Sequence, residues 1–356
     1  MSPGGEALDI VAVGARTPVG ITAEESAASV RAGICRAREF PFIDARGEPV
    51  VLATDGALDT QLEGRDRMWA LLETALGEVM RKSDEILHPG GVARIRVLLA
   101  LPEARPGFAE ADAAWIAEAA ARQVRASSRG VGVDVAIGGR GHAGAIAAVE
   151  LALREARGRD DVLFLVAGND SYVHTDTFLW LESQRRFAQA GVRSGFIPGE
   201  GAGCIALVTP RLRARLGVRP LAAVGGVATA QEKQVRGREA GSSGAGLAQA
   251  VRAAMVGRAL PAHAADAVYI DINGERYRSE EWGFVALKVP EAFKSLQYRA
   301  PSDCWGDVGA AFGTLGAILA VRSYARGYAR GPRSLVLAGS DGVLRGAMLI
   351  LDPRTL

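Results

Sequence analysis

Short apolar runs alternate with amphipathic segments along the whole chain. Runs of strand length lie at residues 9–14, 96–101, 131–137, 221–228, 267–272, 335–337 and 347–351. Apolar positions at helical spacing lie at residues 22–32, 65–81, 109–125, 244–258 and 280–293. Buried strands that alternate with helices predict an α/β protein with mostly parallel sheets.

Local signals add two expectations to this outline. Thr22, with Glu25 three residues later, is typical of the start of a helix. Residues 40–64 show no regular period, so we expect an irregular segment that caps the core or forms a subunit contact.

One longer pattern occurs twice, at residues 141–170 and 306–341. Each copy has a glycine-flanked helix start, a long apolar helix and a buried strand that ends in Gly-Asn-Asp or Gly-Ser-Asp. A single duplication too long for a solenoid indicates two similar halves, which we place at residues 1–215 and 216–356. GHAGA and GDVGA align, which makes His142 and Asp307 equivalent and predicts that they meet at the centre.

Composition and charge narrow the class of function. The formal net charge is +2 and the arginines are scattered without a basic stripe, which argues against nucleic-acid binding. No stretch approaches the ~18 apolar residues of a membrane span, and the N-terminus lacks the pattern of a signal peptide. The three cysteines, Cys35, Cys204 and Cys304, have no metal-type spacing. We therefore expect a cytoplasmic protein with no membrane contact, no metal and no cofactor.

Three further segments are distinctive: SGFIPGEGAG at 194–203, DIVAVGARTPVG at 9–20 and GSDGVLRGAMLIL at 339–351. Together they resemble segments of the β-ketoacyl synthases, the condensing enzymes of fatty-acid and polyketide synthesis. SGFIPGEGAG at 194–203 is similar to the Gly-Phe-x-x-Gly-Glu-Gly-Ala-Gly turn of that family. Residues 9–20 resemble its opening strand and residues 339–351 its closing turn and strand. The resemblance covers most of the chain and implies a thiolase-like fold, a five-layer αβαβα sandwich of two pseudo-twofold related halves. It also implies a homodimer, or a heterodimer with a related synthase, and an acyl-carrier protein as a candidate partner.

The chemistry of that family uses a Cys at the start of the first central helix and two histidines from the second half. The corresponding positions in this chain are His142 (or an immediate neighbour), Asn273 and Asp307, and the family's Lys falls on Ser302. These exchanges remove decarboxylative condensation, whereas the turns that build the scaffold remain. We therefore predict a non-condensing structural partner or adaptor, similar to a polyketide chain-length factor or to an adaptor for secretion effectors.

A first alternative is an enzyme with different chemistry. His142 as general base, oriented by Asp307, with Ser340 as nucleophile, would give an acyltransferase or hydrolase acting on acyl thioesters. The competing interpretation is that His142 is a polar helix-start residue, Asp307 an N-cap and Asn273 a turn residue. We favour the competing interpretation, because the sequence contains no complete site.

A second alternative is nucleotide binding. GRGHAG, with Gly139, Gly141 and Gly144, matches GxGxxG between a predicted strand and a predicted helix. The acidic residue expected ~20 positions onward is represented only by Asp160 and Asp161, at the start of the next strand rather than its end.

Three further observations concern isolated residues. Cys304 has acidic neighbours, which raise the pKa of a thiol rather than activate it. His174 and Asp176 lie in a predicted loop and are too few to form a metal site. The apolar residues of the same segment form either a dimer interface, by the resemblance, or ordinary core packing: Tyr172, Phe178, Trp180 and Leu181.

Overall fold

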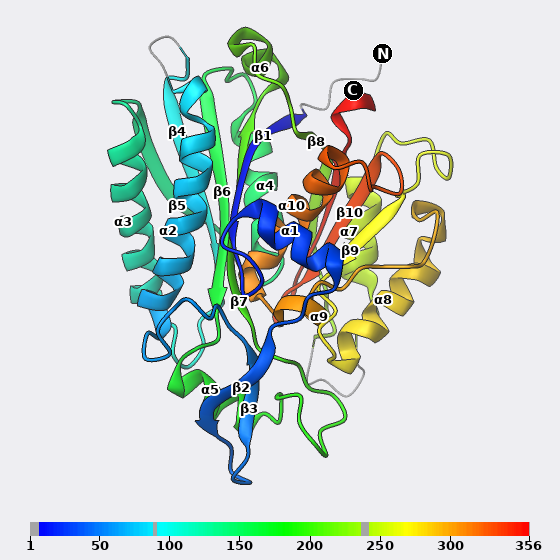
Figure 1. Cartoon of the computed structure of the whole chain (residues 1–356). Helices are drawn as coiled ribbons and strands as arrows, with labels where there is room; N and C mark the ends of the chain where they lie inside the picture. Colours follow the sequence, from blue (N-terminus) through cyan, green and yellow to red (C-terminus); the bar gives the residue numbers. More distant parts are fainter. Residues whose placement is uncertain (1–6, 88–90, 236–241, 356) are drawn as a thin grey trace.

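Two central helices lie between two parts of a continuous, strongly folded sheet (Figure 1). The structure, a computed structural model, describes residues 7–87, 91–235 and 242–355. The strands run in the order β5-β4-β6-β7-β1-β8-β11-β10-β9. They are β1 (Leu8–Arg16), β4 (Arg94–Leu101), β5 (Gly132–Arg140), β6 (Val162–Ser171), β7 (Glu200–Val208), β8 (Ala222–Gln231), β9 (Ala267–Ile270), β10 (Arg333–Gly339) and β11 (Leu344–Leu351).

The pairing of the strands repeats in the two halves. In the first half β6 is parallel to β4 and antiparallel to β7; in the second half β10 is parallel to β9 and antiparallel to β11. The two parts join through a short antiparallel contact, where Leu8, Asp9 and Ile10 of β1 face β8. The repeat read from the sequence is therefore reproduced in the sheet.

Helices cover the sheet on three levels (Figure 1). The central helices α4 and α10 contact each other and the inner faces of both parts of the sheet; α2 and α3 cover the first part from outside, and α7 covers the second, with α8 against it. This arrangement confirms the predicted five layers. The helices are α1 (Ala23–Ala32), α2 (Gly64–Lys82), α3 (Glu110–Ser127), α4 (Gly144–Glu155), α5 (Thr175–Ser183), α6 (Pro210–Leu216), α7 (Ala245–Ala254), α8 (Arg276–Lys288), α9 (Ser302–Trp305) and α10 (Phe312–Ala325).

The central layer is apolar enough to hold the halves together. All but two residues of α10 are buried, and the cluster around α4 and α10 includes Ile146, Val149, Leu315, Ile318 and Phe164 from β6. Burial of an aliphatic or aromatic side chain contributes roughly 1.5–3 kcal/mol. A mainly apolar interface of this extent makes the two halves one packed unit. The predicted division after residue 215 falls in α6, which links β7 to β8.

The start of α1 follows the sequence prediction. Thr22 Oγ1 accepts a hydrogen bond from Glu25 N at 3.2 Å, and Glu25 Oε2 accepts one from Ile21 N at 2.9 Å. The N-cap bond satisfies one of the free backbone donors at the helix start, and the Glu25 bond to the residue before the N-cap fixes the chain that enters the helix.

Two predictions of irregular structure were wrong. Within residues 40–64 the chain forms a hairpin, β2 (Ala37–Ile43) with β3 (Pro49–Ala53). Its alternation is hard to read because β2 is largely exposed and buries only Phe40. The predicted loop around His174 and Asp176 is the start of α5, where His174 Nδ1 accepts a hydrogen bond from Asp176 N at 3.0 Å. Imidazole is an uncommon helix cap, which explains why the sequence signal was missed.

A separate apolar cluster fixes the hairpin to the core. Phe40, Val50 and Leu52 pack with Tyr172 and with the remaining apolar residues of the cluster, Val173, Phe178, Leu181, Phe187 and Phe196. The 172–181 segment thus packs within this chain in the way that the core-packing interpretation expected. No helix in the described ranges is both long and apolar enough to cross a membrane.

Candidate functional site

The starts of the two central helices meet at the centre of the molecule. His142 precedes α4, and its Nε2 lies 2.9 Å from Asp307 Oδ1 and 3.1 Å from Asp307 Oδ2. Gly141 and Gly306, one residue earlier in each copy of the repeat, have φ of 69° and 70°. Glycine is favoured in this left-handed region. The contact predicted from the repeat is confirmed.

Asn273 completes this cluster. Its Nδ2 donates to Asp307 Oδ2 at 2.5 Å, and its Oδ1 accepts from Glu275 N at 3.0 Å. Asp307 Oδ1 also accepts from Gly309 N at 2.7 Å, at the start of the short 3₁₀ turn that leads into α10. The three positions identified from the sequence, His142, Asn273 and Asp307, therefore lie together. Asp307 is not the N-cap of α10, which is Ala311, but its side chain accepts from the backbone two residues onward, and Asn273 does the same for Glu275 N.

Two buried arginines that the sequence did not identify extend the cluster. Arg186 donates to Glu275 through Nε and Nη2, both at 2.8 Å, and to Asp341 Oδ2 at 2.5 Å. Arg278 donates through Nη1 to Asp271 at 2.7 Å and to Gly339 O at 2.6 Å. Its Nη2 lies 3.3 Å from Asp341 Oδ1 and 3.1 Å from His142 Nε2. The two guanidinium groups join second-half carboxylates into one network.

A third arginine ties the first half to the start of α10. Arg105 Nη2 donates to Asp170 Oδ1 at 2.6 Å and to Ser171 O at 2.8 Å. Asp170 Oδ2 in turn accepts from Ala310 N at 3.0 Å. Asp170 and Asp341 end the two copies of the repeat, so the repeat could have predicted that these two carboxylates lie near the centre. Nothing in the repeat predicted the positions of the arginines.

Electrostatics favour a charged His142. Burial lowers the pKa of this imidazole, but the Asp307 carboxylate outweighs burial and the nearby Arg278, so the net pKa is raised above the ordinary 6.5. Burial raises the pKa of Asp307, yet His142 and Arg278 hold it well below its usual range. Nε2 cannot donate to Asp307 and accept from Arg278 at once. The ionised Asp307 carboxylate can only accept, so Nε2 donates to Asp307, and the raised pKa of His142 favours its charged form.

The same balance applies to Asp341. Burial opposes its charge, but Arg186 and Arg278 hold the pKa of this carboxyl well below its usual range. The centre thus contains the carboxylates of Asp170, Asp271, Glu275, Asp307 and Asp341 against the guanidinium groups of Arg105, Arg186 and Arg278. An imidazolium at 142 reduces this excess of negative charge, which is consistent with the raised pKa.

None of the three thiols lies at a central helix start. Cys35 is exposed, Cys204 is in β7, and Cys304 is in α9. Burial raises the pKa of Cys204, and burial together with Asp303 raises that of Cys304, as expected from its acidic neighbours. The first central helix start also has little space. Gly141 has a positive φ there, and a Cβ added to it would lie 2.6 Å from Ser340 Oγ.

Ser340 lies near His142 but is bonded elsewhere. Its Oγ accepts from Ala143 N at 3.2 Å and donates to Arg140 O at 3.4 Å. Among the described residues no hydrogen bond joins Ser340 Oγ to the imidazole. The hydrolase interpretation of His142, Asp307 and Ser340 gains no support from this geometry and stays a prediction.

The glycines of the GRGHAG segment have a packing reason. A Cβ on Gly139 would meet Gly144 O at 2.1 Å, and a Cβ on Gly144 would meet Gly139 C at 2.9 Å. The end of β5 and the start of α4 approach so closely that neither position admits a side chain. Close packing accounts for this part of the motif without a nucleotide, and nucleotide binding stays a prediction.

A small cavity reaches the cluster from outside. It measures about 190 Å³, and His142, Arg105, Glu103, Tyr172 and Trp180 are among its lining residues. Typical small-molecule sites measure ~300–1,000 Å³. Within the described ranges, no group of three or more His, Cys, Asp or Glu side chains is placed to hold a metal ion.

Comparisons with known proteins identify the fold. The sequence matches no family model and no curated protein. Among solved structures it resembles the ketosynthase from module 6 of the bacillaene synthase from Bacillus subtilis 168, with 13% identity, 98% of this chain and 72% of that chain covered, and a TM-score of 0.75. It resembles the ishigamide ketosynthase/chain length factor with 15% identity, coverage of 98% and 99%, and a TM-score of 0.76.

A third similar structure is a type II polyketide synthase acyl-carrier protein in complex with its ketosynthase bound to the hexaketide. The identity is 12%, the coverage 98% of this chain and 99% of that chain, and the TM-score 0.77. Similarity over nearly the whole chain at such low identity establishes architecture rather than activity. The chain has the thiolase-like fold of the ketosynthases.

Proposed function

We propose that this protein is a non-condensing structural partner built on the ketosynthase fold. The observation that carries the proposal is the His142–Asp307 ion pair at the meeting point of the two central helices, in which both side chains are buried. Condensation requires a thiolate there and hydrogen-bond donors for the developing oxyanion. His142 and Asp307 supply no thiolate, and the Nε2–H of His142 is directed to the Asp307 carboxylate.

The surrounding network supports a structural role. Arg186, Arg278, Glu275 and Asp307 are each no more than 4% exposed, and their charges are matched within the protein. Buried charges are retained when they are paired and hydrogen-bonded, whereas a catalytic centre must leave groups available to its substrate. The cavity beside His142 is also small for an acyl-thioester substrate.

An exposed sheet edge supports association with another subunit. β5 is one of the two terminal strands of the sheet and is nine residues long, and within the described ranges it pairs with β4 alone. Long edge strands with unpaired backbone groups are usually covered or paired. We propose that β5 pairs with the same strand of a second copy, or with that of a related synthase.

Two of the similar structures make these partners reasonable. One is a ketosynthase/chain length factor, and the other is a ketosynthase in complex with an acyl-carrier protein. By analogy, the chain would act as a subunit of such an assembly, as an adaptor rather than as the condensing component. The acyl-carrier protein is a candidate partner for the assembly.

The first test concerns acyl chemistry. The purified protein is incubated with acetyl and malonyl thioesters of coenzyme A and of a carrier protein, and intact mass, free thiol and CO₂ are measured. We expect no adduct and no release above the buffer blank, with an active ketosynthase as positive control. An acylated residue or decarboxylation would contradict the proposal. Thioester hydrolysis that Ser340→Ala abolishes would establish the hydrolase alternative instead.

The second test concerns the subunit contact. Light scattering after size exclusion gives the mass of the protein alone and after co-expression with a ketosynthase subunit. Ile137 on β5 is 36% exposed, so Ile137→Lys is expected to dissociate the dimer, while Leu287→Lys, at a 78% exposed position on α8, leaves it intact. A chain that stays monomeric in both settings refutes the structural-partner proposal.

A further inference from the structure

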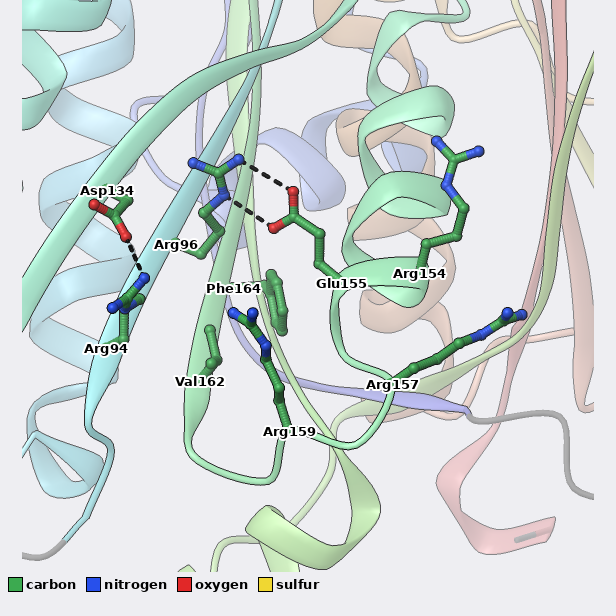
Figure 2. Close-up of a pocket in the computed structure, with 9 residues that line it drawn as sticks. All are labelled: Arg94, Arg96, Asp134, Arg154, Glu155, Arg157, Arg159, Val162 and Phe164. Atoms are coloured by element: carbon green, nitrogen blue, oxygen red, sulfur yellow. Dashed lines mark hydrogen bonds and ion pairs between the residues drawn. The ribbon is translucent and has the colours of Figure 1, made fainter.

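A second cavity lies at the opposite end of the strands from His142. It measures about 490 Å³ and opens where β4, β5 and β6 begin, beside the end of α4 (Figure 2). Cavities of ~300–1,000 Å³ are typical of small-molecule sites. It is lined by Arg94, Arg96, Asp134, Arg154, Glu155, Arg157, Arg159, Val162 and Phe164.

Positive charge predominates in this cavity. Five of its lining residues are arginines and two are carboxylates. Arg94 Nη1 pairs with Asp134 at 2.9 Å, and Arg96 makes two hydrogen bonds to Glu155 at 3.0 and 3.1 Å. Within the described ranges, Arg154 and Arg159 have no ion-pair partner. The charges of Arg154 and Arg159 are therefore not neutralised by an ion pair within the described part of the protein.

The arginines come from segments that only the fold brings together. In Figure 2, Arg159 rises beside Val162 and Phe164 toward the space between Arg94 and the Arg96–Glu155 pair. Arg154 extends from the end of α4 on the other side of Glu155. Arg94, Arg96 and Arg159 therefore surround one part of the cavity, and Arg154 lies apart from them. The sequence showed scattered arginines, because β4 and the end of α4 are about fifty residues apart.

The floor of the cavity limits the class of ligand. Val162 and Phe164 are 4% and 1% exposed, so almost none of their apolar surface is available to a ligand. A ring system would find no aromatic face on which to stack. Recognition must therefore come from charge and hydrogen-bond geometry.

We propose that this cavity binds a small anion with two or three linked phosphoryl groups, either free or as the phosphate portion of a nucleotide. The guanidinium group is a planar fork that donates two parallel hydrogen bonds to phosphate oxygens and keeps its charge at any working pH. Linked phosphates carry several charges over a span that more than one arginine can contact, whereas orthophosphate spans less. Arg159 is the primary contact, with Arg94 and Arg96 at the side of the cavity and Arg154 beyond Glu155.

The experiment is isothermal titration calorimetry with sodium pyrophosphate, tripolyphosphate, ADP and orthophosphate at low ionic strength. We expect saturable binding of pyrophosphate and tripolyphosphate that is at least roughly tenfold tighter than that of orthophosphate, and weaker in 0.5 M salt because of screening. ADP that binds like pyrophosphate identifies the phosphates as the recognised group. ADP that binds while pyrophosphate does not would overturn the proposal, because the nucleoside would then dominate.

Matched variants separate this site from general attraction. The double variant Arg154→Ala/Arg159→Ala is expected to weaken pyrophosphate binding roughly tenfold or more. Arg122→Ala/Arg125→Ala removes the same charge from α3 outside the cavity and is expected to change affinity less than about twofold. Equal weakening by both pairs, or no saturable binding to the wild type, refutes the site.

A variant that is expected to bind more tightly is a control for misfolding, because a misfolded protein would lose affinity rather than gain it. Glu155→Gln releases Arg96 and removes a negative charge from the cavity, so pyrophosphate is expected to bind several-fold tighter. Unchanged or weaker binding by this variant contradicts the proposal. A polyglutamate peptide that competes better than tripolyphosphate would assign the surface to an acidic protein and would also overturn the small-anion proposal.

Discussion

Arginines and carboxylates lie together at both ends of the strands, but at one end they are buried and paired with one another, whereas at the other they are more exposed. Beside His142, Arg186 is fully buried and bonded to two carboxylates. At the other end, the side chain of Arg94 is 54% exposed and is bonded to one, and Arg154 and Arg159 have no described ion-pair partner. A buried charge depends on its protein partners, whereas an exposed one is stabilised by water and remains free to bind. The role of an arginine here follows from burial and pairing.

The largest expected effect is at the buried end. Arg186→Ala leaves Glu275 and Asp341 without their main partner and is expected to lower the free energy of unfolding by about 3–5 kcal/mol. Urea unfolding followed by circular dichroism measures the loss. Arg186→Lys keeps the charge but cannot reproduce the fork, so it should lose less. A loss below about 1 kcal/mol for Arg186→Ala would remove the distinction between the two ends.

A smaller effect is expected at the first helix start. Gly141→Ala must adopt φ of 69° and also places a Cβ 2.6 Å from Ser340 Oγ, so we expect a loss of about 1–3 kcal/mol. Gly158→Ala has a similar φ of 71° but open space around the Cβ. It should therefore cost less in the same unfolding assay, and equal costs would show that the contact with Ser340 is not tight.

The charge of His142 gives a pH dependence. Because its pKa is raised in the folded state, its stabilising contribution is complete below the ordinary 6.5 and is lost as pH rises through the folded value. As pH rises above 6.5, the free energy of unfolding of the wild type should therefore fall more than that of His142→Asn. Unfolding midpoints at several pH values test the difference. Parallel curves for the two proteins would mean that His142 is neutral in the fold.

The smallest effect is at the exposed end. Arg94 and Asp134 are both about half exposed, so a double-mutant cycle with Arg94→Ala and Asp134→Ala should give a coupling energy of about 0.2–1 kcal/mol. The coupling should decrease in 0.5 M salt. A coupling that is large and independent of salt would place this pair in the class of the buried network.

The sequence predicted the frame well because the frame depends on local patterns. Apolar period, the Thr22 cap and the duplicated segment each specify structure within a few residues, and the duplication also predicted the contact of His142 with Asp307. The hairpin β2–β3 was missed because its buried residues are few and its packing partners lie more than a hundred residues away. Only tertiary contacts supply that information.

The charged network was beyond local reasoning for a similar reason. Arg105, Arg186 and Arg278 lie in three unrelated segments, and nothing in their neighbours distinguishes them from exposed arginines. Their partners are distant in the sequence: Asp170 lies 65 positions from Arg105, and Asp341 lies 155 positions from Arg186. Arg278 also contacts Asp341. The cavity lined by arginines was not predicted for the same reason, because its arginines cluster in space but come from separate segments of the sequence.

Each half of the molecule closes the beginning of the other half's central helix. Ser340 from the second half accepts from Ala143 N, and Asp170 from the first half accepts from Ala310 N. Separation of the two halves at this point would therefore leave a backbone N–H at the start of each central helix without its side-chain acceptor.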